Sequence, residues 1–459
     1  MNRDASKRWM LLVLMSINAF TSVDFQALGL VLQSIKVDLH LSDTELGFLT
    51  GLAFALFYSI MGIPLARWAD RGNRVTIIAL CTALYGGAVA LCGMAASFMQ
   101  LMLIRIGVAV GEAGCFPAGS SLLADYFTRA ERPRAVAITL LGAPLSGVIG
   151  YLLVGWLNQV YGWRLTFAVL GAPGLVLAVI TALILKEPRT RDHSTSTALS
   201  AAIELHTPAT VHVLQPTLKE VAITLWSRRT FRHLLYGFSV LSFFGGGIAQ
   251  WQPPFLIRSF GLNTGAIGTW LTLIYGIGGF LGTWCSGQWA SRHAASNERR
   301  QLKGVALGCA VTGVASAMLY LCPNPYWAFA FMALTAVGFS VVTAPLFATL
   351  QALVPERMRA VSVALFYLFS NLIGVGLGPL TVGTLSDTFQ PLFGQESLRY
   401  ALLAMTPGYV WAAWHLWQAH KTVAMDIAKA AEVLDCAIMR AASITGEIPG
   451  IRTSGSQSP

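Results

Sequence analysis

Residues 100–122 read QLMLIRIGVAVGEAGCFPAGSSL and decide the class of fold. The stretch supplies the roughly 20 apolar residues that one helix needs to cross the ~30 Å hydrocarbon core of a bilayer. Only Arg105 and Glu112 within it bear acidic or basic side chains. It therefore predicts a membrane-spanning helix that carries two charges at depth.

The composition of the whole chain supports the same class. Of 459 residues, 55% are hydrophobic and 11% are charged, against roughly 25% charged residues in soluble domains. The net charge of +10 does not indicate nucleic acid as a partner, because the basic residues lie in short clusters between apolar runs. The seven cysteines form no CxxC pair or ligand set, so no metal and no cofactor is expected.

Twelve apolar runs of spanning length follow one another, six before a long polar stretch and six after it. They lie at about 10–33, 46–66, 75–97, 100–122, 134–157, 163–185, 232–257, 266–290, 303–322, 325–350, 360–384 and 398–419. We therefore predict an all-α membrane protein with 12 transmembrane helices in two six-helix bundles. The expected divisions are an N-terminal bundle at 1–185, a cytoplasmic linker at 186–230, a C-terminal bundle at 231–420 and a cytoplasmic tail at 421–459.

Helical spacing of apolar residues recurs in two segments outside the spans. Leu218–Trp226 in the linker and Ala424–Arg440 in the tail are candidates for helices that lie along the membrane surface. For both segments, a plain packing or interface helix is the simpler interpretation than a regulatory element.

The distribution of basic residues predicts the orientation. With the N-terminus in the cytoplasm, 26 of the 31 Lys and Arg residues fall on the cytoplasmic side, 4 fall outside, and Arg105 lies within a span. Cytoplasmic loops carry the excess of Lys and Arg in membrane proteins. We therefore expect a multi-pass protein of the inner (cytoplasmic) membrane with both termini in the cytoplasm.

An internal repeat relates the two halves. AERPRAVAI at 130–138, before the fifth span, matches PERMRAVSV at 355–363, before the eleventh. The match pairs Glu131 with Glu356 and Arg134 with Arg359, an offset of 225 residues. Such an offset, about half of the chain, is typical of two bundles related as parallel repeats.

Three charged side chains lie deep within the spans. Inserting a charged side chain at the centre of a membrane costs at least about 2.5–3.5 kcal/mol of free energy. From the helical rise, Asp24 lies about 21 Å and Arg105 about 22 Å above the inner face, so the two can pair. Glu112 follows Arg105 by two turns on the same helix face, close to the midplane. We interpret Glu112, Asp24 and Arg105 as proton-coupling residues; the alternative is a buried cluster that only joins spans one and four.

A second charged cluster follows span two, in the sequence ADRGNRV. Asp70, Arg71 and Arg74 lie at the inner end of a helix, where they can bond neighbouring helix ends and form an inner gate. A solvated charged loop is the alternative. The corresponding loop of the second half has Ser291 in place of the acid.

The second half supplies aromatic and polar side chains for a substrate cavity. Each polar one among them is also compatible with an ordinary hydrogen bond between helices. The candidates are Phe243, Phe244, Gln250, Trp251, Tyr275, Tyr367 and Asn371.

Several motifs together resemble the major facilitator superfamily. They are DRGNR at 70–74, an arginine followed by GVAVG in span four, and GAPLSGVIG at 142–150. Longer stretches, such as RIGVAVGEAGCFPAGSSLLADYF and WQPPFLIRSFGL, resemble its Spinster-like branch over most of residues 18–262. The resemblance implies a proton-linked transporter of lysolipid- or sphingolipid-like molecules. Asp24, Arg105 and Glu112 occupy the positions of the branch's coupling residues, whereas Phe25 stands where the branch usually has arginine.

Three kinds of function remain open at this point. The first is a proton-coupled secondary transporter of an amphiphilic small molecule that works by alternating access. The second is an organic-anion symporter, with Arg105 binding the substrate, or a drug/proton antiporter of the same superfamily. The third is a membrane receptor without transport. An enzyme is not expected, because no catalytic set of residues lies at mid-depth. We expect protons, the bilayer and a small-molecule substrate as partners, and a monomer.

Overall fold

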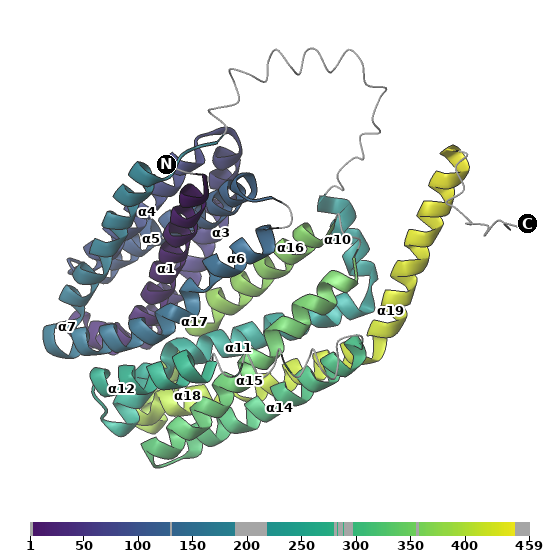
Figure 1. Ribbon diagram of the computed structural model, residues 1–459. Helices are drawn as coiled ribbons and strands as arrows, with labels where there is room; N and C mark the ends of the chain where they lie inside the picture. Colours follow the sequence, from purple (N-terminus) through teal and green to yellow (C-terminus); the bar gives the residue numbers. More distant parts are fainter. Residues whose placement is uncertain are drawn as a thin grey trace, which may run out of the picture.

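The computed structural model describes residues 3–128, 131–188, 218–279, 282, 288, 297–354 and 358–445, and every regular element in these ranges is a helix. The two halves form two adjacent bundles, coloured purple to blue and teal to yellow in Figure 1. Within the described residues, seven helical stretches are long and apolar enough to cross a membrane. Many large hydrophobic side chains on their outer faces are exposed, as expected of surfaces that meet lipid.

The first half consists of seven helices that cover the six expected spans. Helices α2 and α3 together form the second span, and α6 leads into the fifth. Their bounds are α1 (Arg3–Leu39), α2 (Asp43–Thr50), α3 (Leu52–Arg71), α4 (Arg74–Cys92), α5 (Phe98–Tyr126), α6 (Arg132–Leu140) and α7 (Gly142–Ile184).

Helix α7 contains two expected spans, the fifth and the sixth, on either side of a break in the helix. The chain reverses inside it at Gly162, whose φ of 77° and ψ of 169° interrupt the helix. This backbone conformation is essentially restricted to glycine, because a Cβ atom would clash with the neighbouring backbone. Gly162 therefore supplies the turn between spans five and six.

The second half begins after a linker of which residues 186–188 and the part from 218 onwards are described. The later part contains the short helix α10 (Leu218–Ser227), which coincides with the expected linker helix. The bundle follows as α11 (Arg229–Phe260), α12 (Thr264–Leu271), η1 (Thr272–Gly278), α14 (Glu298–Leu321), α15 (Pro325–Ala352), α16 (Arg359–Asn371), η3 (Leu372–Leu377), α17 (Gly378–Phe393), η4 (Gly394–Glu396), α18 (Ser397–Met405) and α19 (Pro407–Thr445).

Two features of the second half differ from a set of straight spans. Helices α16 and α17 are joined through η3, a wider π-helical turn, and α12 continues into the similar turn η1. The tail segment that begins at Ala424 continues α19 and is not a separate surface helix. The expected division between bundle and tail therefore has no break in the backbone.

The ends of the molecule differ in how closely the halves approach. Helix α1 begins and α19 ends at the same end, which we call the terminal end (Figure 1). At the opposite end, which we call the Asp43 end, α2 packs against α17 and α7 packs against α12. A Cβ atom at Gly383 of α17 would overlap the Asp43 carbonyl oxygen, so glycine permits this close approach.

Candidate functional site

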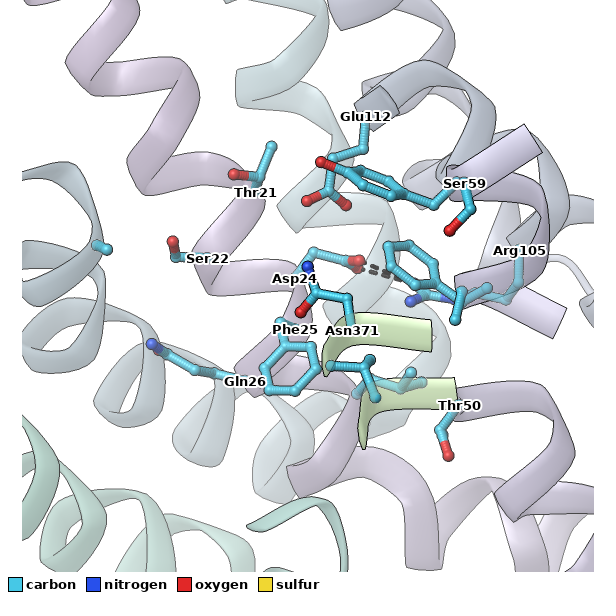
Figure 2. Close-up of a pocket in the computed structure, with 16 residues that line it drawn as sticks. Thr21, Ser22, Asp24, Phe25, Gln26, Thr50, Ser59, Arg105, Glu112 and Asn371 are labelled. Carbon is cyan, nitrogen blue, oxygen red and sulfur yellow. Dashed lines mark hydrogen bonds and ion pairs between the residues drawn. The ribbon is translucent and has the colours of Figure 1, made fainter. Parts of the chain in front are cut away.

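A cavity of about 400 Å³ lies inside the first half at the boundary with the second. Helices α1, α3 and α5 supply most of its wall, and Asn371 and Val375 enter from the second half (Figure 2). The wall is mixed in character, because it combines charged groups with the rings of Phe25 and Phe54. We call this space the central cavity. Its lining residues are Thr21, Ser22, Asp24, Phe25, Gln26, Leu28, Thr50, Phe54, Ala55, Tyr58, Ser59, Arg105, Glu112, Ala143, Asn371 and Val375.

Asp24 and Arg105 form the ion pair expected from their depths. Arg105 Nη1 donates to Asp24 Oδ2 at 2.9 Å and to Oδ1 at 3.1 Å, and both side chains are only 3% exposed. The guanidinium also lies over the Phe54 ring, 5.9 Å from its centroid. The Nε atom of Arg105 is buried and has no hydrogen-bond partner in the described part of the chain. The two opposite charges thus neutralise each other.

Glu112 lies two turns along α5 from Arg105 and faces the same cavity (Figure 2). Its side chain is partly exposed to that space, and no described Lys, Arg or His side chain forms an ion pair with it. Asp24, Arg105 and the Tyr58 and Tyr85 rings surround it closely enough to interact electrostatically. The structure therefore places all three deep charges together, with Glu112 as the uncompensated one.

A second pocket of about 230 Å³ opens beside Glu112, between α1, α5 and α6. We call it the side pocket. It shares Thr21, Tyr58 and Glu112 with the central cavity and runs from there towards the terminal end. Its lining residues are Leu14, Ile17, Asn18, Thr21, Tyr58, Glu112, Cys115, Phe116, Gly119, Ser120, Leu123, Val136, Thr139 and Leu140. The sequence did not single out Asn18 or Tyr58, because neither bears a charge within its span.

The DRGNR cluster is split between surface and interior. Asp70 and Arg71 are exposed, whereas Arg74 is fully buried. Arg74 Nη1 donates to Asp125 Oδ2 at 2.6 Å, and its guanidinium and backbone N–H both bond Glu187. These contacts join α4, α5 and the segment after α7 within the first half. In this conformation Arg74 therefore braces one bundle and does not bridge the two.

A network of hydrogen bonds and ion pairs that bridges the halves lies at the Asp43 end. Arg258 of α11 donates from Nη1 and Nη2 to both Asp43 carboxylate oxygens, at 2.7 Å each. Lys36 Nζ and Ser386 Oγ also donate to this carboxylate, at 2.5 and 2.6 Å. Asp387 of α17 accepts from the backbone N–H groups of Asp43 and Thr44, at 3.1 and 2.7 Å.

We call this set, Lys36, Asp43, Thr44, Arg258, Ser386 and Asp387, the Asp43 network. Sequence reasoning missed it, although SDTE at 42–45 shows a helix start with an acid at its first position. Of the partners of Asp43, Arg258 and Ser386 lie 215 and 343 residues away, and the sequence contains no signal that brings them together with it.

The cavity candidates of the second half are dispersed in the structure. Asn371 lines the central cavity. Trp251 is fully buried and donates its indole N–H to the Pro379 carbonyl at 2.9 Å, so it joins α11 to α17. Tyr275 donates to Gln252 in a short hydrogen bond.

The remaining candidates also pack between helices. Gln250 is buried close to Gly29 of α1, and its amide nitrogen has no partner among the described residues. Phe243 and Phe244 pack edge to face, with ring centroids 4.9 Å apart. The side chain of Tyr367 lies outside the described residues.

Comparisons of the sequence with known proteins identify transport proteins as its relatives. A family model described as Major Facilitator Superfamily matches residues 14–379. The chain is 32% identical over 397 residues to an MFS-type efflux pump of Mycolicibacterium smegmatis, which covers 86% of this chain and 87% of that protein. It is 24% identical over 389 residues to a probable L-galactonate transporter of Escherichia coli, which covers 83% and 82%.

A solved structure is also similar over nearly the whole chain. It is the crystal structure of a bacterial homologue of the human lysosomal transporter Spinster, in an inward-facing and unoccupied conformation. The TM-score is 0.78 and the identity 30%, over 92% of this chain and 98% of that one.

Proposed function

Because this chain belongs to the Major Facilitator Superfamily and resembles its Spinster branch, we propose that it is a proton-coupled secondary transporter of an amphiphilic small molecule. The family membership accounts for a transporter with 12 membrane-spanning helices in two bundles. The proton coupling and the kind of substrate are inferred from the cavity. Of the alternatives, the organic-anion symporter has a specific observation in its favour.

The observation that carries the proposal is the uncompensated Glu112 carboxylate in the central cavity. Asp24 and Arg105 pair with each other, whereas Glu112 faces the cavity and forms no ion pair with a described cation. An ionised carboxylate at this depth is costly unless it gains a proton or a positively charged ligand. Glu112 is thus the group whose charge can change during transport at the lowest energetic cost.

In alternating access, the protonation state of Glu112 would control the free energy of closing the cavity. The Asp43 network holds the halves together at one end, while the side pocket extends from Glu112 towards the other. If the terminal end is cytoplasmic, as the basic residues predict, the cavity is closed to the outside in this conformation. Protonation of Glu112 removes a buried charge, which lowers the cost of the state in which the cavity is sealed from water at both ends.

The organic-anion symporter is the second candidate function. Its support is the Arg105 guanidinium, a charged donor group that lines the central cavity. A substrate carboxylate is a suitable acceptor for that donor. Small carboxylates would then compete with transport, whereas uncharged lipid-like ligands would not, and this competition experiment separates the two candidates.

The test of proton coupling is a Glu112→Gln variant in proteoliposomes with an imposed pH gradient. We expect glutamine to keep the size and polarity of the side chain, so that the protein folds, while proton-driven flux is abolished. Glu298→Gln, which changes a partly exposed acid at the start of α14, is the matched control and should transport at the rate of the unmodified protein. An undiminished proton-driven rate in Glu112→Gln would refute the proposal.

A further inference from the structure

The side pocket has an arrangement that the coupling role of Glu112 does not require. Its walls are mainly apolar, supplied by Leu14 and Ile17 of α1, Phe116 and Leu123 of α5, and Leu140 of α6. Its mouth is the one place where it meets the central cavity, at Thr21, Tyr58 and Glu112. A ligand in the side pocket therefore has an apolar body and presents its polar group to Glu112.

The groups at the mouth favour one sign of charge. The Glu112 carboxylate accepts hydrogen bonds, whereas the Thr21 hydroxyl already donates to the Asn18 carbonyl oxygen at 3.1 Å. None of the residues that line the side pocket is basic. A carboxylate with no basic side chain beside it in the pocket wall favours a ligand that brings its own N–H groups or positive charge.

Two basic side chains of the first half are engaged with other acids, and Arg132 of α6 donates to the Ala124 and Phe127 carbonyl oxygens. Arg105 pairs with Asp24 at 2.9 Å, and Lys7, near the start of α1, pairs with Glu131 at 2.8 Å. The charges that line the central cavity are therefore two carboxylates and one guanidinium. An anionic ligand there meets an excess of like charge, whereas a cationic one restores neutrality.

We propose that the side pocket and Glu112 together bind a cationic amphiphile, with its alkyl or aryl body in the pocket and its ammonium group on the Glu112 carboxylate. The assignment deepens the proposed transport function, because it uses the same carboxylate. The ammonium and the proton compete for that group: binding of the cation to protonated Glu112 releases one proton to water, and loss of the cation allows one proton to return. The chemistry is exchange of a proton for an organic cation.

The binding test uses the full chain in lipid nanodiscs and three probes with the same decyl tail. They are decyltrimethylammonium, uncharged decanol and the anion decyl sulfate. We expect the cation to bind at least about tenfold more tightly than either of the others, because a charge pair in a poorly hydrated site contributes that much or more. One proton should appear in a weakly buffered solution for each cation bound at a pH where Glu112 is protonated. Tighter binding of the anion would overturn the proposal.

Two variants separate the head site from the tail site. Glu112→Gln should weaken binding of decyltrimethylammonium by about tenfold or more and abolish proton release. Val136→Trp changes a lining residue that is 42% exposed, so the larger ring can be accommodated while it narrows the pocket. It should weaken binding of decyltrimethylammonium but leave binding of tetramethylammonium, which has no tail, unchanged. Equal effects of Val136→Trp on both cations, or none on either, would overturn the placement of the tail.

The two proposals fail in different ways. If Glu112→Gln stops proton-driven flux but binds the decyl cation as the unmodified protein does, proton coupling stands and the cation site is refuted. If the unmodified protein binds the cation at Glu112 with proton release but shows no proton-driven flux, the site stands and the transport function is refuted.

Discussion

At the scale of single residues, the ion pair between Asp24 and Arg105 was the interaction most accessible to sequence reasoning. Each residue lies inside one regular helix, and a constant rise per residue converts sequence position into depth. Pairing two opposite charges at equal depth in an apolar medium offsets the cost of burying each, and the structure contains the pair. The same reasoning placed Glu112 on the face of Arg105 but did not reveal the side pocket, which depends on how α6 packs.

A buried ion pair is costly to break from one side only. Arg105→Gln leaves the Asp24 carboxylate without its cation at 3% exposure and should lower stability by about 3–5 kcal/mol. The double variant Asp24→Asn with Arg105→Gln removes both charges and should recover much of that loss. Thermal unfolding in detergent compares the three proteins. Equal destabilisation of the single and double variants would show that the pair is not energetically coupled.

Glu131 carries a pH-dependent contact outside the spans. The hydrogen bond from Lys7, followed by those from Thr128, lowers the Glu131 pKa from 4.5 to about 2. A carboxylate with a lowered pKa contributes stability that is fully present above pH 4.5 and is lost as the pH falls towards 2. The difference in melting temperature between the unmodified protein and Glu131→Gln should therefore be small, since the pair is exposed, and should shrink over that window. A difference that stays constant with pH would contradict this assignment.

At the scale of elements, the sequence predicted spans well and their internal irregularities poorly. The bilayer thickness sets the length of an apolar run, and that length can be read from the sequence. The helices α4, α5 and α14 therefore lie within a few residues of the expected runs. The π-helical turns η1 and η3 depend on packing between helices, and hydropathy does not record packing. The continuation of α19 beyond Ala424 was missed because a polar segment was expected to start a new element.

The turn at Gly162 permits a test at this scale. Gly162→Ala places a Cβ at φ 77° and ψ 169°, and it should destabilise the protein by about 1–3 kcal/mol. Gly62→Ala is the matched control, because Gly62 lies inside α3 and a Cβ there meets no atom within 4 Å. Alanine should be neutral or stabilising at that helical position. Melting temperatures that fall equally in both variants would indicate that the turn does not require glycine.

At the scale of the whole molecule, the repeat and the count of spans predicted two bundles but not how they meet. The apolar pattern within each half specifies what that bundle buries. The contact between bundles would change during the proposed alternating access, so it leaves only a weak trace in the sequence. The interface at the Asp43 end consists of small residues and a few charges, such as Gly383, Asp43 and Arg258. Each of these is unremarkable alone and gains significance only from its partner in the other half.

The Asp43 network should therefore set how often that end opens. Asp43→Asn leaves Arg258 and Lys36 without their shared carboxylate, which destabilises the closed arrangement and should shift the population towards an open one. Spin labels at the exposed positions Val37 and Leu392, in a cysteine-free background, report the separation of the halves by pulsed electron resonance. The matched control is Asp38→Asn, since Asp38 pairs at 2.7 Å with Arg164 of its own half and should leave the distances unchanged. If Asp43→Asn gives the same distance distribution as Asp38→Asn, the network does not hold the halves together, and packing of α2 against α17 must do so without it.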